Sequence, residues 1–185
     1  MNIILCAQFN KSISGIRAMR IKQIAITTII ILFSFNISTF SQSNQRIIHV
    51  FVALCDNEHQ GIVPVSARIG NGEDPGNNLY WGAKYGLKTF FTNSSNWTLL
   101  KIIENPADEI LERCIFKHNN SNTYLLADAY RGKEIKQATI DFLNSASCGK
   151  IDSVSIDLDR VPVSFKFGRA TNLLAYVGHN GLMDF

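Results

Sequence analysis

The sequence Asn172-Leu-Leu-Ala-Tyr-Val-Gly-His-Asn-Gly181 places a histidine directly after a short apolar run. The run has the length of a strand, and Gly178 marks its end. In an open α/β sheet, ligands and catalytic groups collect at the carboxyl ends of the strands. His179 is therefore the first candidate functional residue, and we interpret the rest of the chain outward from it.

Two earlier apolar runs also end in polar clusters. Residues 47–54 are almost continuously apolar, which is typical of a central strand covered on both faces. Residues 123–127 follow the polar turn 119–122, which is preceded by another apolar run, and this pattern predicts a hairpin. The polar residues at the ends of the two runs are Cys55, Asp56, Asn57, Asp128, Tyr130 and Arg131.

Helical spacing of apolar residues appears twice, at 79–91 and at 133–146. A further short strand is expected at 97–103, whereas 151–167 alternates like an edge strand or a surface loop. Alternation of strands and helices predicts an α/β fold with a mostly parallel sheet and helices on both faces. Right-handed crossovers would bring the polar strand ends to one edge of the sheet.

A thiol, carboxylates and an imidazole at one edge form a candidate catalytic site. Histidine titrates near neutrality and activates a neighbouring thiol. The candidate catalytic residues are His179, Cys55 and Asp128, and the candidate binding residues are Asp56, Asn57, Tyr130, Arg131 and Asn180. Other interpretations stay open, because Cys55 also fits a buried hydrophobe, Asp128 a helix cap, and His179 a structural histidine.

The aromatic pair Tyr80 and Trp81 is interpreted as packing in preference to a site lining. The spacing of cysteines and histidines fits no zinc motif, so we expect no metal and no cofactor.

The segment 173–181 resembles the apolar strand and His-Gly motif of the caspase-like cysteine peptidases, which include metacaspases and legumains. The segment 124–143 is similar to the metacaspase strand and its following helix, and the order of the two segments agrees. The chain also looks like uncharacterised exported bacterial proteins that carry Leu-Tyr-Trp-Gly-Ala (79–83) and Tyr-Val-Gly-His-x-Gly-Leu-Met-Asp-Phe (176–185) segments.

This resemblance implies a caspase-like fold in which His179 is the general base for a cysteine at the end of the next strand. In the family the histidine and glycine are adjacent, whereas Asn180 separates them here. The nucleophile strand would follow Phe185, so we expect a C-terminally incomplete domain that lacks its nucleophile. Two alternatives are a non-catalytic exported binding or interaction domain, which uses the loop 70–78 and the strand ends, and a hydrolase that uses Cys55 with His179.

Residues 1–41 have the layout of a secretory signal peptide. Arg20 and Lys22 precede a short apolar stretch, and Thr39 and Ser41 are suitable for cleavage before Gln42. Met19 is an alternative start, and an uncleaved anchor is an alternative to cleavage. We therefore expect a single mature domain, 42–185, that is exported to the periplasm or secreted and has no stable membrane span.

Removal of this segment changes the charge of the chain. It contains four of the 18 Lys and Arg residues and none of the 15 Asp and Glu residues, which leaves 14 against 15. A near-neutral domain without a basic cluster is not expected to bind nucleic acid. We expect an unknown peptide or protein partner, self-association through an exposed sheet edge, and at most one disulfide, with Cys114 and Cys148 as the pair to test.

Overall fold

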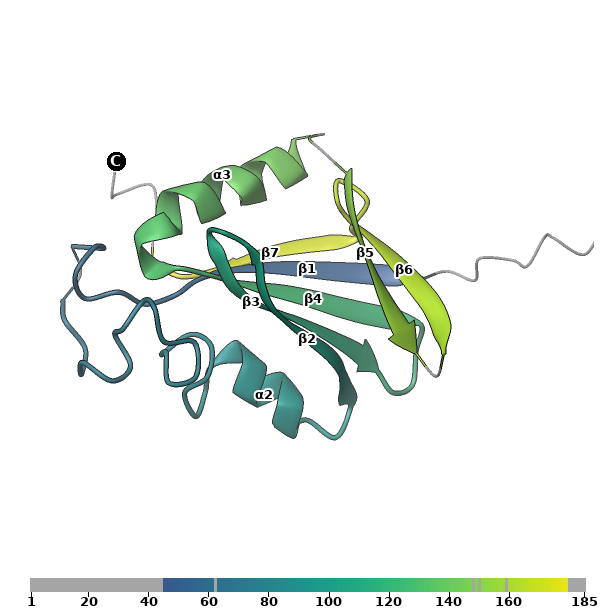
Figure 1. Ribbon diagram of the computed structural model, residues 1–185, viewed down its shortest axis with the longest axis horizontal. Helices are drawn as coiled ribbons and strands as arrows, with labels where there is room; N and C mark the ends of the chain where they lie inside the picture. Colours follow the sequence, from purple (N-terminus) through teal and green to yellow (C-terminus); the bar gives the residue numbers. More distant parts are fainter. Residues whose placement is uncertain (1–44, 62, 148, 150, 159, 180–185) are drawn as a thin grey trace, which may run out of the picture. The chain divides into compact units, whose positions relative to one another are not determined.

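The computed structural model describes residues 45–179 except 62, 148, 150 and 159, so the expected signal peptide, Asn180 and the region around Phe185 lie outside the described residues. The described part forms a five-stranded sheet of order β2-β3-β4-β1-β7 and a two-stranded hairpin, β5-β6 (Figure 1). The strands are β1 (Arg46–Ala53), β2 (Trp97–Ala107), β3 (Ile110–His118), β4 (Thr123–Tyr130), β5 (Ile151–Leu158), β6 (Val161–Gly168) and β7 (Leu173–Val177).

The main sheet is mixed. β1 pairs in parallel with β4 on one side and with β7 on the other. β2, β3 and β4 pair antiparallel, because the turns at 108–109 and 119–122 are too short for a parallel crossover. The prediction of a caspase-like α/β fold, with a mostly parallel sheet and helices on both faces, is therefore wrong. The predicted hairpin around 119–122 and the strand that leads to His179 are confirmed.

Two α-helices lie within the described residues, α2 (Leu87–Asn93) and α3 (Ile135–Ala146), and the 3-10 turn η2 (Gly132–Glu134) precedes α3. The helix expected at 133–146 is confirmed. The helix expected at 79–91 forms only at its end, since residues 79–86 fold into turns. A Cβ atom on Gly82 would lie 2.3 Å from the carbonyl oxygen of Gly76, so this glycine allows a close backbone approach within the turns.

Successive side chains of β1 point to opposite faces of the sheet, so they belong to separate parts of the hydrophobic core. On one face, Val50 and Val52 pack in a cluster with the buried Trp81, which belongs to the long loop after β1. The helix α2 packs against the same cluster. Ile47 faces the hairpin β5-β6, and Phe51 faces α3. The hairpin and α3 thus share one face (Figure 1), and His49 lies on β1 between the residues that contact them.

Within the described residues, no helix has the length and apolar character that crossing a membrane requires.

Candidate functional site

Three parallel strands bring their carboxyl ends to one edge of the sheet. Ala53 of β1 is in register with Tyr130 of β4, and Val52 of β1 is in register with Val177 of β7. Arg131 follows β4 directly, whereas Cys55 and His179 are the second residues after β1 and β7. The expectation that these strand ends point the same way is confirmed, although the sheet as a whole is not mostly parallel.

The imidazole of His179 is held between two side chains of the loop after β1. Its Nδ1 lies 3.1 Å from Oε1 of Gln60, and the hydroxyl oxygen of Tyr80 lies 3.3 Å from Nε2 and 3.4 Å from Nδ1. The Tyr80 and His179 rings meet edge to face, with centroids 5.4 Å apart. Two hydrogen-bonding groups therefore orient the ring at the carboxyl edge.

The hydrogen bonds of Gln60 determine the tautomer of His179. The amide nitrogen of Gln60 donates to the carbonyl oxygens of Leu54 at 2.7 Å and Gly132 at 2.9 Å. Its Oε1 is therefore an acceptor, and it accepts from the backbone N–H of Asp56 at 3.1 Å. Because an acceptor faces Nδ1, that nitrogen carries the proton of a neutral imidazole. The lone pair of His179 is then on Nε2, next to the Tyr80 hydroxyl.

Cys55 is close to this group but enclosed. The residue is fully buried, and its backbone exchanges two hydrogen bonds with the Asn78 side chain, at 3.0 and 2.8 Å. Burial, and secondarily the Asp56 carboxylate, raise the pKa of its thiol. No hydrogen bond joins this thiol to His179 in the described part of the chain. Cys55 thus has the environment of a buried hydrophobe and lacks that of an activated nucleophile.

We expect the thiols of Cys55 and Cys114 to resist a thiol reagent in the native protein. Both are buried and form no disulfide within the described residues, to which Cys148, the predicted partner of Cys114, does not belong. Burial raises the pKa of each thiol. A neutral, inaccessible thiol reacts slowly because the thiolate is the nucleophile. Labelling with a chromogenic disulfide at pH 8, before and after unfolding in guanidinium, measures this protection. Fast native labelling of Cys55, located by mass spectrometry, would contradict it.

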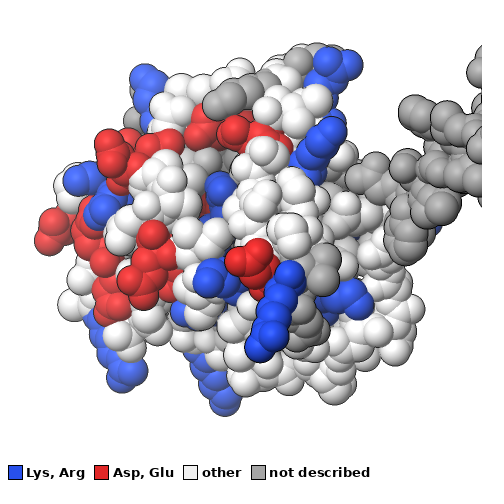
Figure 2. Space-filling view, turned by 45° about the vertical axis from the view of Figure 1, so that its right-hand side comes forward, with Lys and Arg blue, Asp and Glu red and all other residues white. Residues whose placement is uncertain are grey.

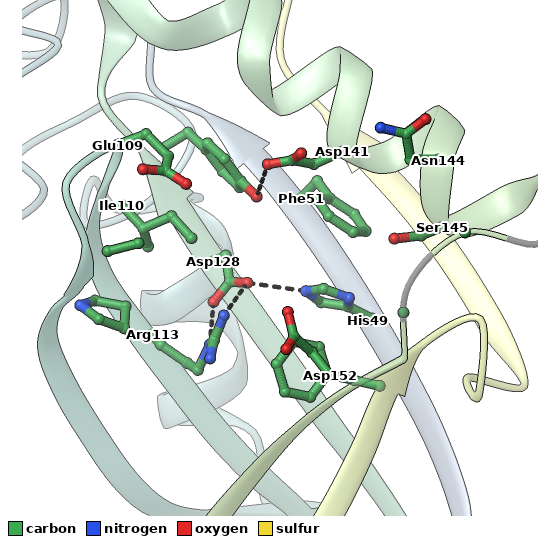
Figure 3. A pocket seen from close by; sticks show the side chains of 16 residues that line it. His49, Phe51, Glu109, Ile110, Arg113, Asp128, Asp141, Asn144, Ser145 and Asp152 are labelled. Atoms are coloured by element: carbon green, nitrogen blue, oxygen red, sulfur yellow. Dashed lines mark hydrogen bonds and ion pairs between the residues drawn. The ribbon is translucent and has the colours of Figure 1, made fainter.

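Asp128 lies away from the carboxyl edge. Its carboxylate is 1% exposed and accepts two hydrogen bonds from Arg113, at 2.6 and 2.8 Å. It accepts a third from Nε2 of His49 at 2.9 Å (Figure 3). Burial alone would raise the pKa of Asp128, but the hydrogen bonds from His49 and Arg113 outweigh it and lower the pKa to about 2. Asp128, a candidate catalytic residue of the strand ends, is thus the centre of a separate buried ionic group.

The predicted binding residues that the structure describes make local structural contacts. Asp56 accepts from the backbone N–H of Glu58 at 2.9 Å and from the His59 ring at 2.9 Å. The remaining three bond the loops and α3: Asn57 bonds the backbone of Val65, Tyr130 donates to Asp141, and Arg131 donates to Asp108 and Glu73.

Sequence reasoning missed Gln60, His49 and Arg113, and it interpreted Tyr80 as packing. His49 carried a signal, since it is an ionisable residue inside the apolar run 47–54. Gln60 carried none, because a polar residue in a polar loop is unremarkable. The interpretation of Trp81 as core is confirmed, since the residue is fully buried.

No group of three or more His, Cys, Asp and Glu side chains suitable for a metal ion occurs among the described residues. Comparisons with known proteins identify no relative: no family model matches the chain, and no curated protein or solved structure is significantly similar to it. The resemblance to cysteine peptidases of the caspase-like type stays a prediction.

Proposed function

We propose that the carboxyl edge of β1 and β7 is the acid–base site of an exported, cysteine-peptidase-related protein, with His179 as the general base. The observation that carries the proposal is the hydrogen bond from His179 Nδ1 to Gln60, whose own orientation is fixed by two backbone carbonyls. A general base needs a held ring and a free lone pair, and this arrangement supplies both.

In this proposal Nε2 of His179 takes a proton from the attacking group. The Tyr80 hydroxyl lies 3.3 Å from Nε2 and 3.4 Å from Nδ1, so it stands beside the ring and leaves the line of the Nε2 lone pair to a nucleophile or a nucleophilic water. Cys55 is not assigned this role, because its thiol is buried and its pKa is raised. The resemblance places the nucleophilic cysteine on a strand after His179, which is outside the described residues.

We expect the substitution His179→Ala to lower peptide hydrolysis by a factor of about 100 or more, the usual contribution of a general base. The assay uses the exported protein purified from its source and a panel of fluorogenic peptide amides with varied residues before the cleaved bond. His59→Ala is the control, because the His59 side chain is 50% exposed and, among the described residues, bonds to Asp56 of its own turn.

Three outcomes are informative. Loss of hydrolysis in His179→Ala alone supports the proposal. Equal rates in the wild type and His179→Ala would remove the general-base role, and the absence of hydrolysis of every peptide by the wild type would contradict the peptidase assignment. Nitrogen-15 chemical shifts of the His179 ring report separately on the tautomer.

A non-catalytic binding function is the second candidate. It is favoured by a cavity of about 450 Å³ on the face that carries α3. The residues that line this cavity do not include His179, Gln60 or Tyr80.

A further inference from the structure

A cavity of about 450 Å³ lies over the sheet between α3 and the hairpin β5-β6 (Figure 3). The strands β1, β3 and β4 supply its floor, with His49, Arg113 and Asp128 among the floor residues. Asp141 and Ser145 of α3 line one side, and Asp152 and Phe167 of the hairpin line another. The volume is within the range of small-molecule sites in proteins.

His49 lines this cavity, and one nitrogen of its ring has no hydrogen-bond partner among the described residues. His49 is 2% exposed, and in its neutral imidazole, with Nε2 donating to Asp128, the lone pair is on Nδ1. Nδ1 is buried and has no hydrogen-bond partner among the described residues. A buried polar atom without a partner destabilises a fold, because nothing replaces its lost hydration. The arrangement therefore points to a donor that is supplied from outside the chain.

The charged residues of the lining are mostly acidic. Asp128 is balanced by the bidentate Arg113, and the remaining carboxylates belong to Glu109, Asp141 and Asp152. Acidic side chains also gather over one part of the surface in the view of Figure 2, whereas basic ones are scattered. A lining with this excess of carboxylates attracts cations and repels anions.

Apolar and aromatic surface accompanies these acceptors. The ring of Phe167 stands edge-on to His49, with centroids 5.2 Å apart, and the Arg113 guanidinium already lies 4.7 Å from the centre of the same Phe167 ring. Phe51 lines the cavity beside His49, with ring centroids 4.0 Å apart. A molecule that fits this cavity therefore has an apolar part as well as hydrogen-bond donors.

We propose that this cavity binds a small organic cation, an ammonium or guanidinium group on a short apolar stem. The cation donates one N–H to Nδ1 of His49, its charge is balanced by Asp141 and Asp152, and its stem packs on Phe51 and Phe167. A bare metal ion fits less well, because the described residues do not form a set of three ligands. The same chemistry is found in a free amine and in an arginine or lysine side chain of a peptide.

The test measures binding of three probes to the purified protein by NMR titration, with the His49 ring signals as the site-specific readout. The probes are benzylamine, its neutral counterpart benzyl alcohol, and a blocked tripeptide with a central arginine. We expect saturable binding of benzylamine with a shift of the His49 Nδ1 signal, and at least tenfold weaker binding of benzyl alcohol. Tighter binding of the tripeptide than of benzylamine would identify a peptide side chain as the source of the cation.

Two variants distinguish binding to the carboxylates of the cavity from attraction by the net charge of the protein. Asp141→Asn combined with Asp152→Asn retains the shape of both side chains, and we expect it to weaken benzylamine binding at least tenfold. Asp157→Asn is the control, because Asp157 is exposed on the same strand as Asp152 and does not line the cavity. We expect it to change the affinity less than twofold.

Two results would overturn the proposal. One is equal binding of benzylamine and benzyl alcohol, which would show that charge is not recognised. The other is an unmoved His49 signal with every probe up to about 10 mM, a concentration that should saturate even a weak fragment site. In that case water alone satisfies Nδ1.

Discussion

The substitution Asp128→Asn is expected to destabilise the protein by about 3 kcal/mol, which is a large part of a small domain's stability. It keeps the shape of the side chain but removes the charge that balances Arg113, whose side chain is 12% exposed. A buried guanidinium that loses its carboxylate remains desolvated without compensation. Urea unfolding at pH 7, followed by circular dichroism, measures the change.

Asp157→Asn is the control for this measurement, since it removes an exposed carboxylate, and we expect it to change stability by less than about 0.5 kcal/mol. The double variant Asp128→Asn with Arg113→Met removes the stranded cation, so it should recover part of the loss. Asp128→Asn with wild-type stability would show that the buried ionic group does not contribute to the fold as described.

The acid dependence of stability provides a second measurement on the same variant. The folded-state pKa of Asp128 is lowered from 3.8 to about 2, so its ionised form stabilises the folded state. This contribution, about 2 kcal/mol, is complete above about pH 4 and is lost as the pH falls through about 2. We expect the stability of the wild type to fall more than that of Asp128→Asn in this window.

Local patterns predicted the elements that local physics determines. The strand before His179, the hairpin around 119–122 and α3 all follow from apolar spacing and turn residues. The pairing of β2 and β3 was not predicted, because no local pattern states which strands become neighbours. The expected helix at 79–91 failed for a local reason, since the turns require close backbone contacts at Gly82.

Only the part of the candidate site that depends on local sequence was predicted. Position after a strand was enough to select Cys55 and His179, and the parallel pairing of β1 and β7 brings their strand ends to one edge. Asp128 was assigned to that edge, but its partner His49 is 79 residues away in the chain. Only the register of β1 with β4 determines that pairing. Whether a polar side chain near the end of a strand lies at the carboxyl edge or on a face of the sheet depends on the direction in which it points. That direction depends on packing that the sequence alone does not show.

The substitution Gln60→Leu is expected to affect stability and the candidate site together. Gln60 is 1% exposed, and its amide satisfies the carbonyl oxygens of Leu54 and Gly132 and the N–H of Asp56. Leucine has a similar size but leaves these three backbone groups without partners. Each buried backbone group without a partner costs about 1 to 3 kcal/mol, and water can satisfy some of them. We therefore expect the free energy of unfolding, measured in urea, to fall by about 3 kcal/mol.

The same variant tests whether Gln60 positions His179. Without the Oε1 acceptor, the proton of the imidazole is no longer held on Nδ1, so nitrogen-15 shifts should show a mixture of tautomers. Gln137→Leu is the control, because Gln137 is a half-buried residue of α3 whose amide donates to Asp141, four residues along the same helix. We expect it to change stability by less than about 0.5 kcal/mol and to leave the His179 signals unchanged.

Gln60→Glu separates the two roles of this residue. A carboxylate still accepts from Nδ1 of His179 but cannot donate to Leu54 or Gly132. We therefore expect Gln60→Glu to lose stability as Gln60→Leu does, while it keeps the proton of His179 on Nδ1. Loss of the tautomer in both variants would mean that loop packing orients the ring. Retention of the tautomer in Gln60→Leu would remove Gln60 from the acid–base site and leave the Tyr80 contact as the remaining reason for the ring's position.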